Sequence, residues 1–449
     1  MRTKREQVQA HRFVIRRIVS AMVGGEPETL DLPMRRLSIA AAAGTAITLL
    51  VFAGFWVVGL MFPGGADSWK TDGAIVIEEE TGARFVYWDG QLHPVLNYAS
   101  ALLIAAEGDG DVHLVHQSSL ADTPRGRMLG IPDAPDALPE SDRFTSTPWQ
   151  TCSAPDAFNP TERDSHVLIG SEMEPGTKLG SMSLLLESDG RHYLAIGDTK
   201  YRVPSDNSLP ALGTNAEQAV DVDSVLVNSL RTGPDLVVKI PKKGEPGREL
   251  AGETYEIGSV FSNNGKFYVL VDDGLAPIGE LAAELIGTAR VELPTAVVGQ
   301  NQSKTTIEPE DFPKKRPTVV EGIDSRDTAI CSVFDDGVLE LMTHSPIPKS
   351  LALNAQPAPV GEKDEIATAD HVSLPGGFAA LIRAEVSPGA AGGTIYLITD
   401  QGWKYGMSTE TIEAFGYQKV KPTTVPSSML ALLPTGPVLS QGNALLPLQ

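Results

Sequence analysis

The pattern of apolar and polar residues divides the chain into an N-terminal helix, one long apolar run and a large region of short strands. The apolar run extends from Leu37 to Phe62, LSIAAAAGTAITLLVFAGFWVVGLMF, and contains no charged residue. A helix rises about 1.5 Å per residue, so roughly 20 apolar residues cross the ~30 Å hydrocarbon core of a bilayer. The run is longer than that and predicts one membrane-spanning helix.

A cleavable signal peptide is the alternative interpretation of this run. The apolar part of a signal peptide has about 7–15 residues and ends at a small-residue cleavage site. The run here is much longer and follows 36 residues that have a pattern of their own. We therefore interpret residues 37–62 as a permanent anchor.

The residues before the span predict an amphipathic helix from Thr3 to Met22. Thr3 and Glu6 have capping-box spacing, and apolar residues recur on one face through Val14, Ile18 and Met22. Two interpretations of this helix remain open. It lies on anionic lipid, or it docks through Val14, Ile18 and Met22 on a cytosolic partner.

Charge predicts the orientation of the span. Residues 1–36 contain eight basic and four acidic residues, a net charge of +4; the whole chain carries −21, so the part after the span carries −25. The positive-inside rule places the N-terminus in the cytoplasm and the acidic region outside. Such an acidic region also argues against nucleic-acid binding, which requires basic surfaces.

The outer region contains a repeated order of three short strands followed by a helix. In the first copy the strands are Ala74–Glu79, Phe85–Trp88 and Leu92–Val95, and the helical segment is Asn97–Ile104. Asp-Gly and Asn-Gly pairs separate strands, because tight hairpins need positive φ. Copies begin near residues 74, 182, 255 and 378. This uneven spacing excludes a solenoid, so the segments between copies belong to another domain.

Cys152 and Cys331 are the only cysteines, and each lies in a segment between copies. Outside the cytoplasm a lone pair of thiols tends to oxidise, so we predict a disulfide between them. The bond would bring both segments into one central domain, with the second and third copies looped out of it. Two free thiols are the alternative.

Several segments resemble the EccB family, the membrane-anchored component of mycobacterial type VII (ESX) secretion systems. They are REQVQAHRFVIRRIVSAMV followed by MRR and the span, WDGQLHPVLNYASALLI in the first copy, and TVPSSMLALLPTGPVLS from Thr424 to Ser440. The resemblance covers essentially the whole chain. It implies a protein of the inner (cell) membrane with a periplasmic C-terminal region. The implied partners are other Ecc membrane subunits, including an FtsK-like motor ATPase. From the long, acidic, turn-rich surfaces of the outer region we also expect the chain to associate with further copies of itself.

The expected fold is a single-pass membrane protein with a mainly β (α+β) extracytoplasmic region, in which four strand-strand-strand-helix repeat domains surround a central β-domain. The expected segments are 1–36 (cytoplasmic helix), 37–62 (span), 63–120 (repeat 1), 121–180 (first segment of the central domain), 181–220 (repeat 2), 221–300 (repeat 3), 301–377 (second segment of the central domain) and 378–449 (repeat 4 and tail).

No motif for catalysis is visible in the sequence. There is no G-x-x-x-x-G-K-[ST] phosphate loop, and Gly265 is explained by a hairpin turn. There is also no G-x-S-x-G nucleophile elbow. His113 and His116 are three residues apart, so on a strand they face opposite sides and cannot hold one metal ion. We therefore expect no catalytic residue, no cofactor and no metal site.

Three functions are compatible with these features. The first is a structural core subunit of an ESX secretion complex, a periplasmic scaffold on which the translocation machinery assembles. The second is an ATPase of the same complex, an activity described for the family but unsupported by a phosphate loop here. The third is a periplasmic cell-wall-binding protein, because the repeats resemble a wall-binding subunit of phage lysins. The first has the strongest support from topology and repeats.

Overall fold

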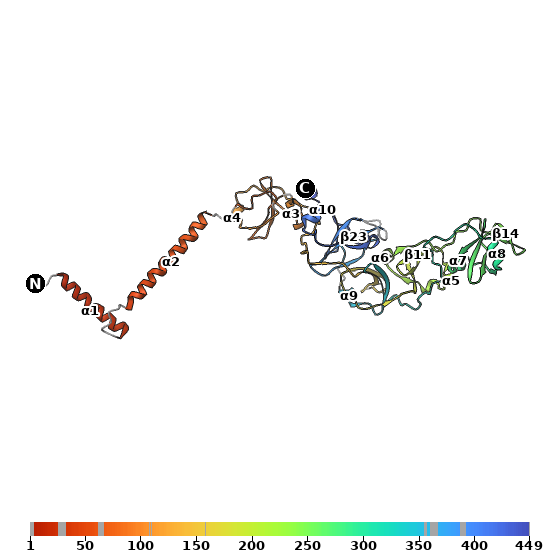
Figure 1. Ribbon diagram of the computed structural model, residues 1–449, viewed down its shortest axis with the longest axis horizontal. Helices are drawn as coiled ribbons and strands as arrows, with labels where there is room; N and C mark the ends of the chain where they lie inside the picture. The colour runs from red at the N-terminus through yellow and green to blue at the C-terminus, as the bar shows by residue number, and fades with distance from the viewer. Residues whose placement is uncertain are drawn as a thin grey trace.

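The computed structural model describes residues 4–25, 33–61, 67–106, 108, 110–157, 159–353, 357–359, 367–386 and 392–448. The molecule is elongated, with two helices at its N-terminal end and a row of β-rich units beyond them (Figure 1). The C-terminus lies beside α3 and α10, in the part of the row nearer to α2 and not at its far end, so the chain runs outward along the row and then returns.

Helix α1 (Lys4–Gly24) confirms the predicted N-terminal helix. It ends where Gly25 takes a φ of 75° and donates its backbone N–H to the carbonyl of Ala21 at 3.1 Å. A left-handed glycine after the last turn is a common helix terminator, because it has no Cβ to clash. Thr3, the expected capping residue, lies outside the described residues.

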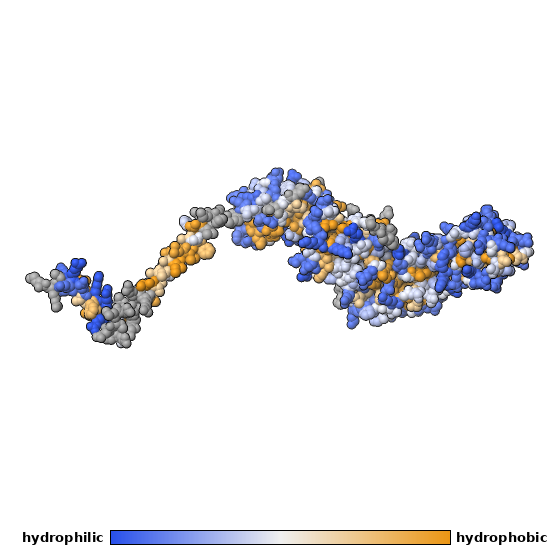
Figure 2. Space-filling model, viewed as in Figure 1, coloured by the Kyte–Doolittle hydropathy of each residue, from blue (hydrophilic) through white to orange (hydrophobic). Residues whose placement is uncertain are grey.

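Helix α2 (Pro33–Met61) contains the predicted span. Within the described residues it is the one helix long and apolar enough to cross a bilayer, over Leu37–Val57 with a mean hydropathy of 2.0. None of this stretch is buried inside the protein. Figure 2 shows it as a hydrophobic rod between α1 and the outer units. An uncovered apolar rod of this length is what a lipid environment requires.

Four small sheets share one topology, and we call each, with its helices, a unit. Unit 1 contains β1 (Ile75–Glu78), β2 (Arg84–Trp88), β3 (Gln91–Pro94), α3 (Tyr98–Ala105), β4 (Val112–Val115) and α4 (Gln117–Leu120). Unit 2 contains β9 (Ser183–Ser188), β10 (Arg191–Ile196), β11 (Thr199–Val203), α5 (Leu209–Leu212), β12 (Val220–Asp221), α6 (Ser224–Ser229) and β13 (Arg231–Thr232).

The other two units follow the same order. Unit 3 contains β16 (Val260–Asn263), β17 (Lys266–Val271), β18 (Gly274–Ile278), α7 (Glu280–Ile286), β19 (Arg290–Glu292) and α8 (Thr295–Gln300), preceded by the hairpin β14 (Pro246–Leu250) and β15 (Glu253–Glu256). Unit 4 contains β23 (Ala379–Glu385), β24 (Ile395–Thr399), β25 (Lys404–Met407), α10 (Thr409–Ala414), β26 (Thr423–Pro426), α11 (Ser427–Leu430) and α12 (Gln441–Ala444), with β5 (Phe144–Thr145) beside β23.

Each unit has one strand more than the sequence pattern predicts. After the first helix the chain returns and pairs parallel to the first strand, as β4 with β1, β12 with β9, β19 with β16 and β26 with β23. A second helix follows, and the next residues lie parallel to the third strand. The returning strand is only two residues long in unit 2, too short to leave an alternating pattern. The predicted turns are present: Asp89, Asp189 and Asn264 all have positive φ before their glycines.

A six-stranded central sheet has the order β22-β7-β6-β20-β21-β8. Its strands are β6 (Trp149–Pro155), β7 (Arg163–Ile169), β8 (Thr177–Lys178), β20 (Ala329–Asp335), β21 (Val338–His344) and β22 (His371–Ser373), and α9 (Lys349–Leu353) follows β21. These strands come from chain segments before unit 2 and after unit 3. Cys152 on β6 lies directly opposite Cys331 on β20, and the two form the predicted disulfide.

Shared hydrophobic cores fix the order of the units in the row. One core joins units 1 and 4, a second joins unit 4 to the central sheet, a third joins the central sheet to unit 2, and a fourth joins units 2 and 3. The row therefore runs unit 1, unit 4, central sheet, unit 2, unit 3 (Figure 1). Equivalent helices make the outer joints, because α3 packs on α10 and α5 packs on α7.

Candidate functional site

The apolar face of α1 is exposed. Val14, Ile18 and Met22 are 52%, 51% and 83% exposed, and they lie one helical turn apart. Among the described residues nothing covers this face. Exposed aliphatic side chains gathered on one face of a helix are typical of a surface that a partner or a lipid layer buries. The structure thus brings the three predicted docking residues together, and their role as a docking surface stays a prediction.

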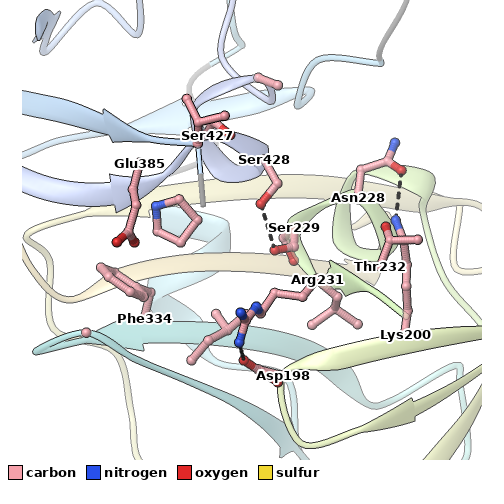
Figure 3. A pocket seen from close by; sticks show the side chains of 16 residues that line it. Asp198, Lys200, Asn228, Ser229, Arg231, Thr232, Phe334, Glu385, Ser427 and Ser428 are labelled. Atoms are coloured by element: carbon pink, nitrogen blue, oxygen red, sulfur yellow. Dashed lines mark hydrogen bonds and ion pairs between the residues drawn. The ribbon is translucent and has the colours of Figure 1, made fainter. Parts of the chain in front are cut away.

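A hollow of about 520 Å³ lies where unit 2, unit 4 and the central sheet meet. Its walls come from β11, α6 and β13 on one side, β20 below, and β23 with α11 on the other (Figure 3). The equivalent helices α6 and α11 pack on each other here. Ser229 on α6 is hydrogen-bonded through Oγ to Ser332 Oγ on β20 at 2.7 Å. This hydrogen bond joins unit 2 to the central sheet, and Ser428 Oγ on α11 donates to the backbone carbonyl of Ser229 at 3.5 Å, which joins unit 4 to unit 2.

The cations that line the hollow are already engaged by protein groups. Lys200 Nζ donates to the carbonyl of Val227 at 2.8 Å, and burial lowers the pKa of Lys200. Arg231 Nη1 is 3.1 Å from Asp198 Oδ2. A phosphate site needs free cations or a cradle of backbone N–H groups. Both side chains are thus already bound to other groups of the protein, so the geometry favours a structural joint.

A third cluster lies at the edge of the central sheet. Asp164 and His166 on β7 and His371 on β22 each place one ligand-type atom within 4.8 Å of the others. The rings of His166 and His371 stack with centroids 4.6 Å apart. Burial, together with the neighbouring His371, lowers the pKa of His166 to about 4. Burial raises the pKa of Asp164.

The sequence analysis did not single out this cluster. An Asp-x-His pair on a β-strand was the available signal, since residues two apart on a strand share a face. His371 is 205 residues away from His166, and only the β7–β22 pairing brings it opposite. The histidines that the sequence did single out are not brought together: His113 lies within β4, whereas His116 follows it and lies 3.2 Å from both Glu79 and Glu80.

Comparison with known proteins agrees with this architecture. The family model for "Type VII secretion system ESX-1, transport TM domain B" matches residues 1–448. The ESX-3 secretion system ATPase EccB3 of Mycolicibacterium smegmatis is 27% identical, over 98% of this chain and 90% of that protein.

Two solved structures have a similar fold. The EccB3 dimer from the ESX-3 core complex is 25% identical and has a TM-score of 0.59, over 83% of this chain and 100% of that one. The periplasmic assembly from the ESX-5 inner membrane complex is 25% identical and has a TM-score of 0.57, over 83% of this chain and 95% of that one. With the family model matching from the N-terminal helix through unit 4, the chain belongs to the EccB family of type VII secretion membrane components.

Proposed function

We propose that this chain is a structural core subunit of an ESX inner membrane complex, anchored by α2, and that its row of units is a periplasmic scaffold for assembly of the machinery. The observation that carries the proposal is the combination of one uncovered apolar helix with an elongated row of units joined by shared cores. The EccB3 dimer of the ESX-3 core complex and the periplasmic assembly of the ESX-5 complex support this role, since both have the same fold.

The proposed orientation places α1 in the cytoplasm. The net charge of +4 before the span and −25 after it supports this, because basic residues are retained on the cytoplasmic side. In this orientation the disulfide between Cys152 and Cys331 lies in an oxidising compartment, where such bonds persist.

We further propose that the outer region consists of four repeat domains arranged on a central β-domain. The common topology of the four sheets supports this arrangement. The strand pairing favours longer domains than the sequence pattern suggests. The first repeat domain then continues past residue 120, because Arg125 pairs with Leu92. The second repeat domain continues past residue 220 to Thr232, because β13 pairs with β11.

The proposed partners are further copies of the chain, other Ecc membrane subunits and an FtsK-like motor ATPase. We assign the cytosolic contact to Val14, Ile18 and Met22 on α1, which are exposed together. The contact requires burial of these aliphatic side chains, so a charge among them opposes it. Docking on lipid is the alternative, and it would also bury this face.

Co-purification of the complex from membranes in mild detergent tests the proposal. Ile18→Asp is expected to reduce recovery of the partner subunits strongly and to leave membrane insertion intact. Gln9→Asp is the matched control, because Gln9 is exposed on the opposite side of α1 and receives the same charge. Unchanged recovery with Ile18→Asp would favour the lipid-surface interpretation. Failure of the unaltered chain to recover any Ecc subunit would contradict the core-subunit proposal itself.

A further inference from the structure

The cluster of Asp164, His166 and His371 has the arrangement of a metal site built on two neighbouring strands. His371 on β22 lies directly opposite His166 on β7, and Asp164 precedes His166 by two residues, so all three lie on one face of the sheet. His371 Nε2 is 3.3 Å from Asp164 Oδ2. Two ligands bound at 2.0–2.1 Å to one tetrahedral ion are about 3.3 Å apart. The spacing of this pair matches a hydrogen bond as well as a shared ion. Because the two imidazole rings stack nearly parallel, one ring would have to turn to point its nitrogen at the ion.

Unsatisfied nitrogen atoms provide an independent observation. His166 is only 5% exposed, and its Nδ1 is buried with no hydrogen-bond partner among the described residues. The Nδ1 atom of His371 is in the same condition. Buried polar atoms in folded proteins nearly always have a partner, and each exception needs an explanation. A bound ion would supply the missing partner for at least one of these rings.

We propose that Asp164, His166 and His371 bind one divalent transition-metal ion, and that Zn²⁺ is the ion they select. Two imidazoles and one carboxylate form a donor set that suits zinc, with water completing the tetrahedron. Calcium and magnesium are disfavoured because they prefer oxygen ligands throughout. Zinc binding here requires no change of oxidation state and no fourth protein ligand, because water can take the fourth position.

The surrounding hydrogen bonds hold the two strands in this register. Asp370, next to His371, accepts hydrogen bonds through Oδ2 from the backbone N–H of Ser165 at 2.9 Å and from its hydroxyl at 2.6 Å. These contacts fix β22 against β7 immediately before the histidine pair. Such outer contacts orient metal ligands in established sites.

The ion would strengthen a weak place in the fold. β22 is a three-residue edge strand, and the chain enters unit 4 soon after it. Its neighbour β7 pairs with β6, which carries the disulfide. An ion held by both β7 and β22 would tie the path into unit 4 to the covalently fastened part of the central sheet. The inferred role is structural.

The direct test measures zinc retained by the full-length chain, purified in detergent without a histidine tag. The protein is stripped with a chelator, incubated with Zn²⁺, passed through a desalting column and analysed by mass spectrometry for metal content. We expect about one Zn²⁺ per unaltered chain, as three fixed ligands bind a single ion. We also expect a higher melting temperature in the presence of Zn²⁺, because an ion that binds the folded state stabilises it.

Variants locate the ion. His371→Ala and Asp164→Asn are each expected to lose most of the retained zinc and the zinc-dependent thermal shift. His344→Ala is the matched control, because His344 is also a buried histidine of the central sheet with an unpartnered Nε2, but it lies outside the cluster. No zinc on the unaltered chain would overturn the proposal, whatever the variants do. Equal retention by the unaltered chain and His371→Ala would also overturn it.

Discussion

Removal of the disulfide is expected to destabilise the central sheet strongly. Cys152 and Cys331 are 179 residues apart in sequence, and both side chains are fully buried. In the chain-entropy model, cross-linking a loop of this length stabilises the folded state by about 5 kcal/mol, since the bond restricts the unfolded chain. The loop contains all of units 2 and 3. Without the disulfide, the two halves of the central sheet must therefore find each other across this long segment.

The perturbation is best made in two ways. Reduction of the unaltered protein without alkylation breaks only the covalent bond and leaves both thiols in the packed core. The double variant Cys152→Ala/Cys331→Ala removes the bond and both sulfur atoms from a packed core. If loop entropy dominates, the two forms should lose nearly the same stability. A larger loss in the double variant would measure the packing contribution of the sulfur atoms.

The assay must report on the central sheet alone, because a chain of several units does not unfold in one step. Hydrogen exchange of peptides from β6 and β20, followed by mass spectrometry over a urea series, meets this need. With a urea m-value of roughly 2–3 kcal/mol/M, a loss of about 5 kcal/mol lowers the midpoint by about 2 M. A loss below about 1 kcal/mol in the reduced protein would refute the loop-entropy argument, since the unfolded loop would then be restricted without the bond.

Three further predictions concern activity, topology and packing. The outer region, residues 67–449, is expected neither to bind nor to hydrolyse ATP above background, because Lys200 and Arg231 are already bound to other protein groups. Saturable ATP binding, with hydrolysis abolished by one substitution, would contradict this prediction. An impermeant thiol reagent should label Arg191→Cys but not Gln9→Cys in intact cells, because both positions are exposed and only residue 191 is expected outside the cytoplasm. The reverse labelling would invert the orientation. Leu281→Ala should lower the free energy of unfolding, measured with urea, by roughly 2–5 kcal/mol, because Leu281 is fully buried in the core that joins units 2 and 3. The control Val338→Ala, at an exposed position, should change the free energy of unfolding by less than about 0.5 kcal/mol.

The sequence alone was sufficient for features that depend on local patterns. The apolar run around Leu37–Val57 predicts a span because length and charge suffice for that inference. The turns at Asp89, Asp189 and Asn264 were predictable because Asp-Gly and Asn-Gly favour the positive φ that tight hairpins require. The disulfide was predictable because the chain offers only one pair of cysteines.

Tertiary structure alone decided the features that depend on distant pairing. The two-residue strand Val220–Asp221 exists because β9 supplies a partner, and no periodicity fits in two residues. The order of the units in the row follows from which of them share a hydrophobic core. The sequence shows which residues are apolar but not which unit each of them will pack against. His371 joins Asp164 and His166 only through the β7–β22 register, across 205 residues of chain. The pattern of neighbouring residues specifies local conformation. Which distant segments come into contact is decided only when the whole chain packs into its tertiary structure.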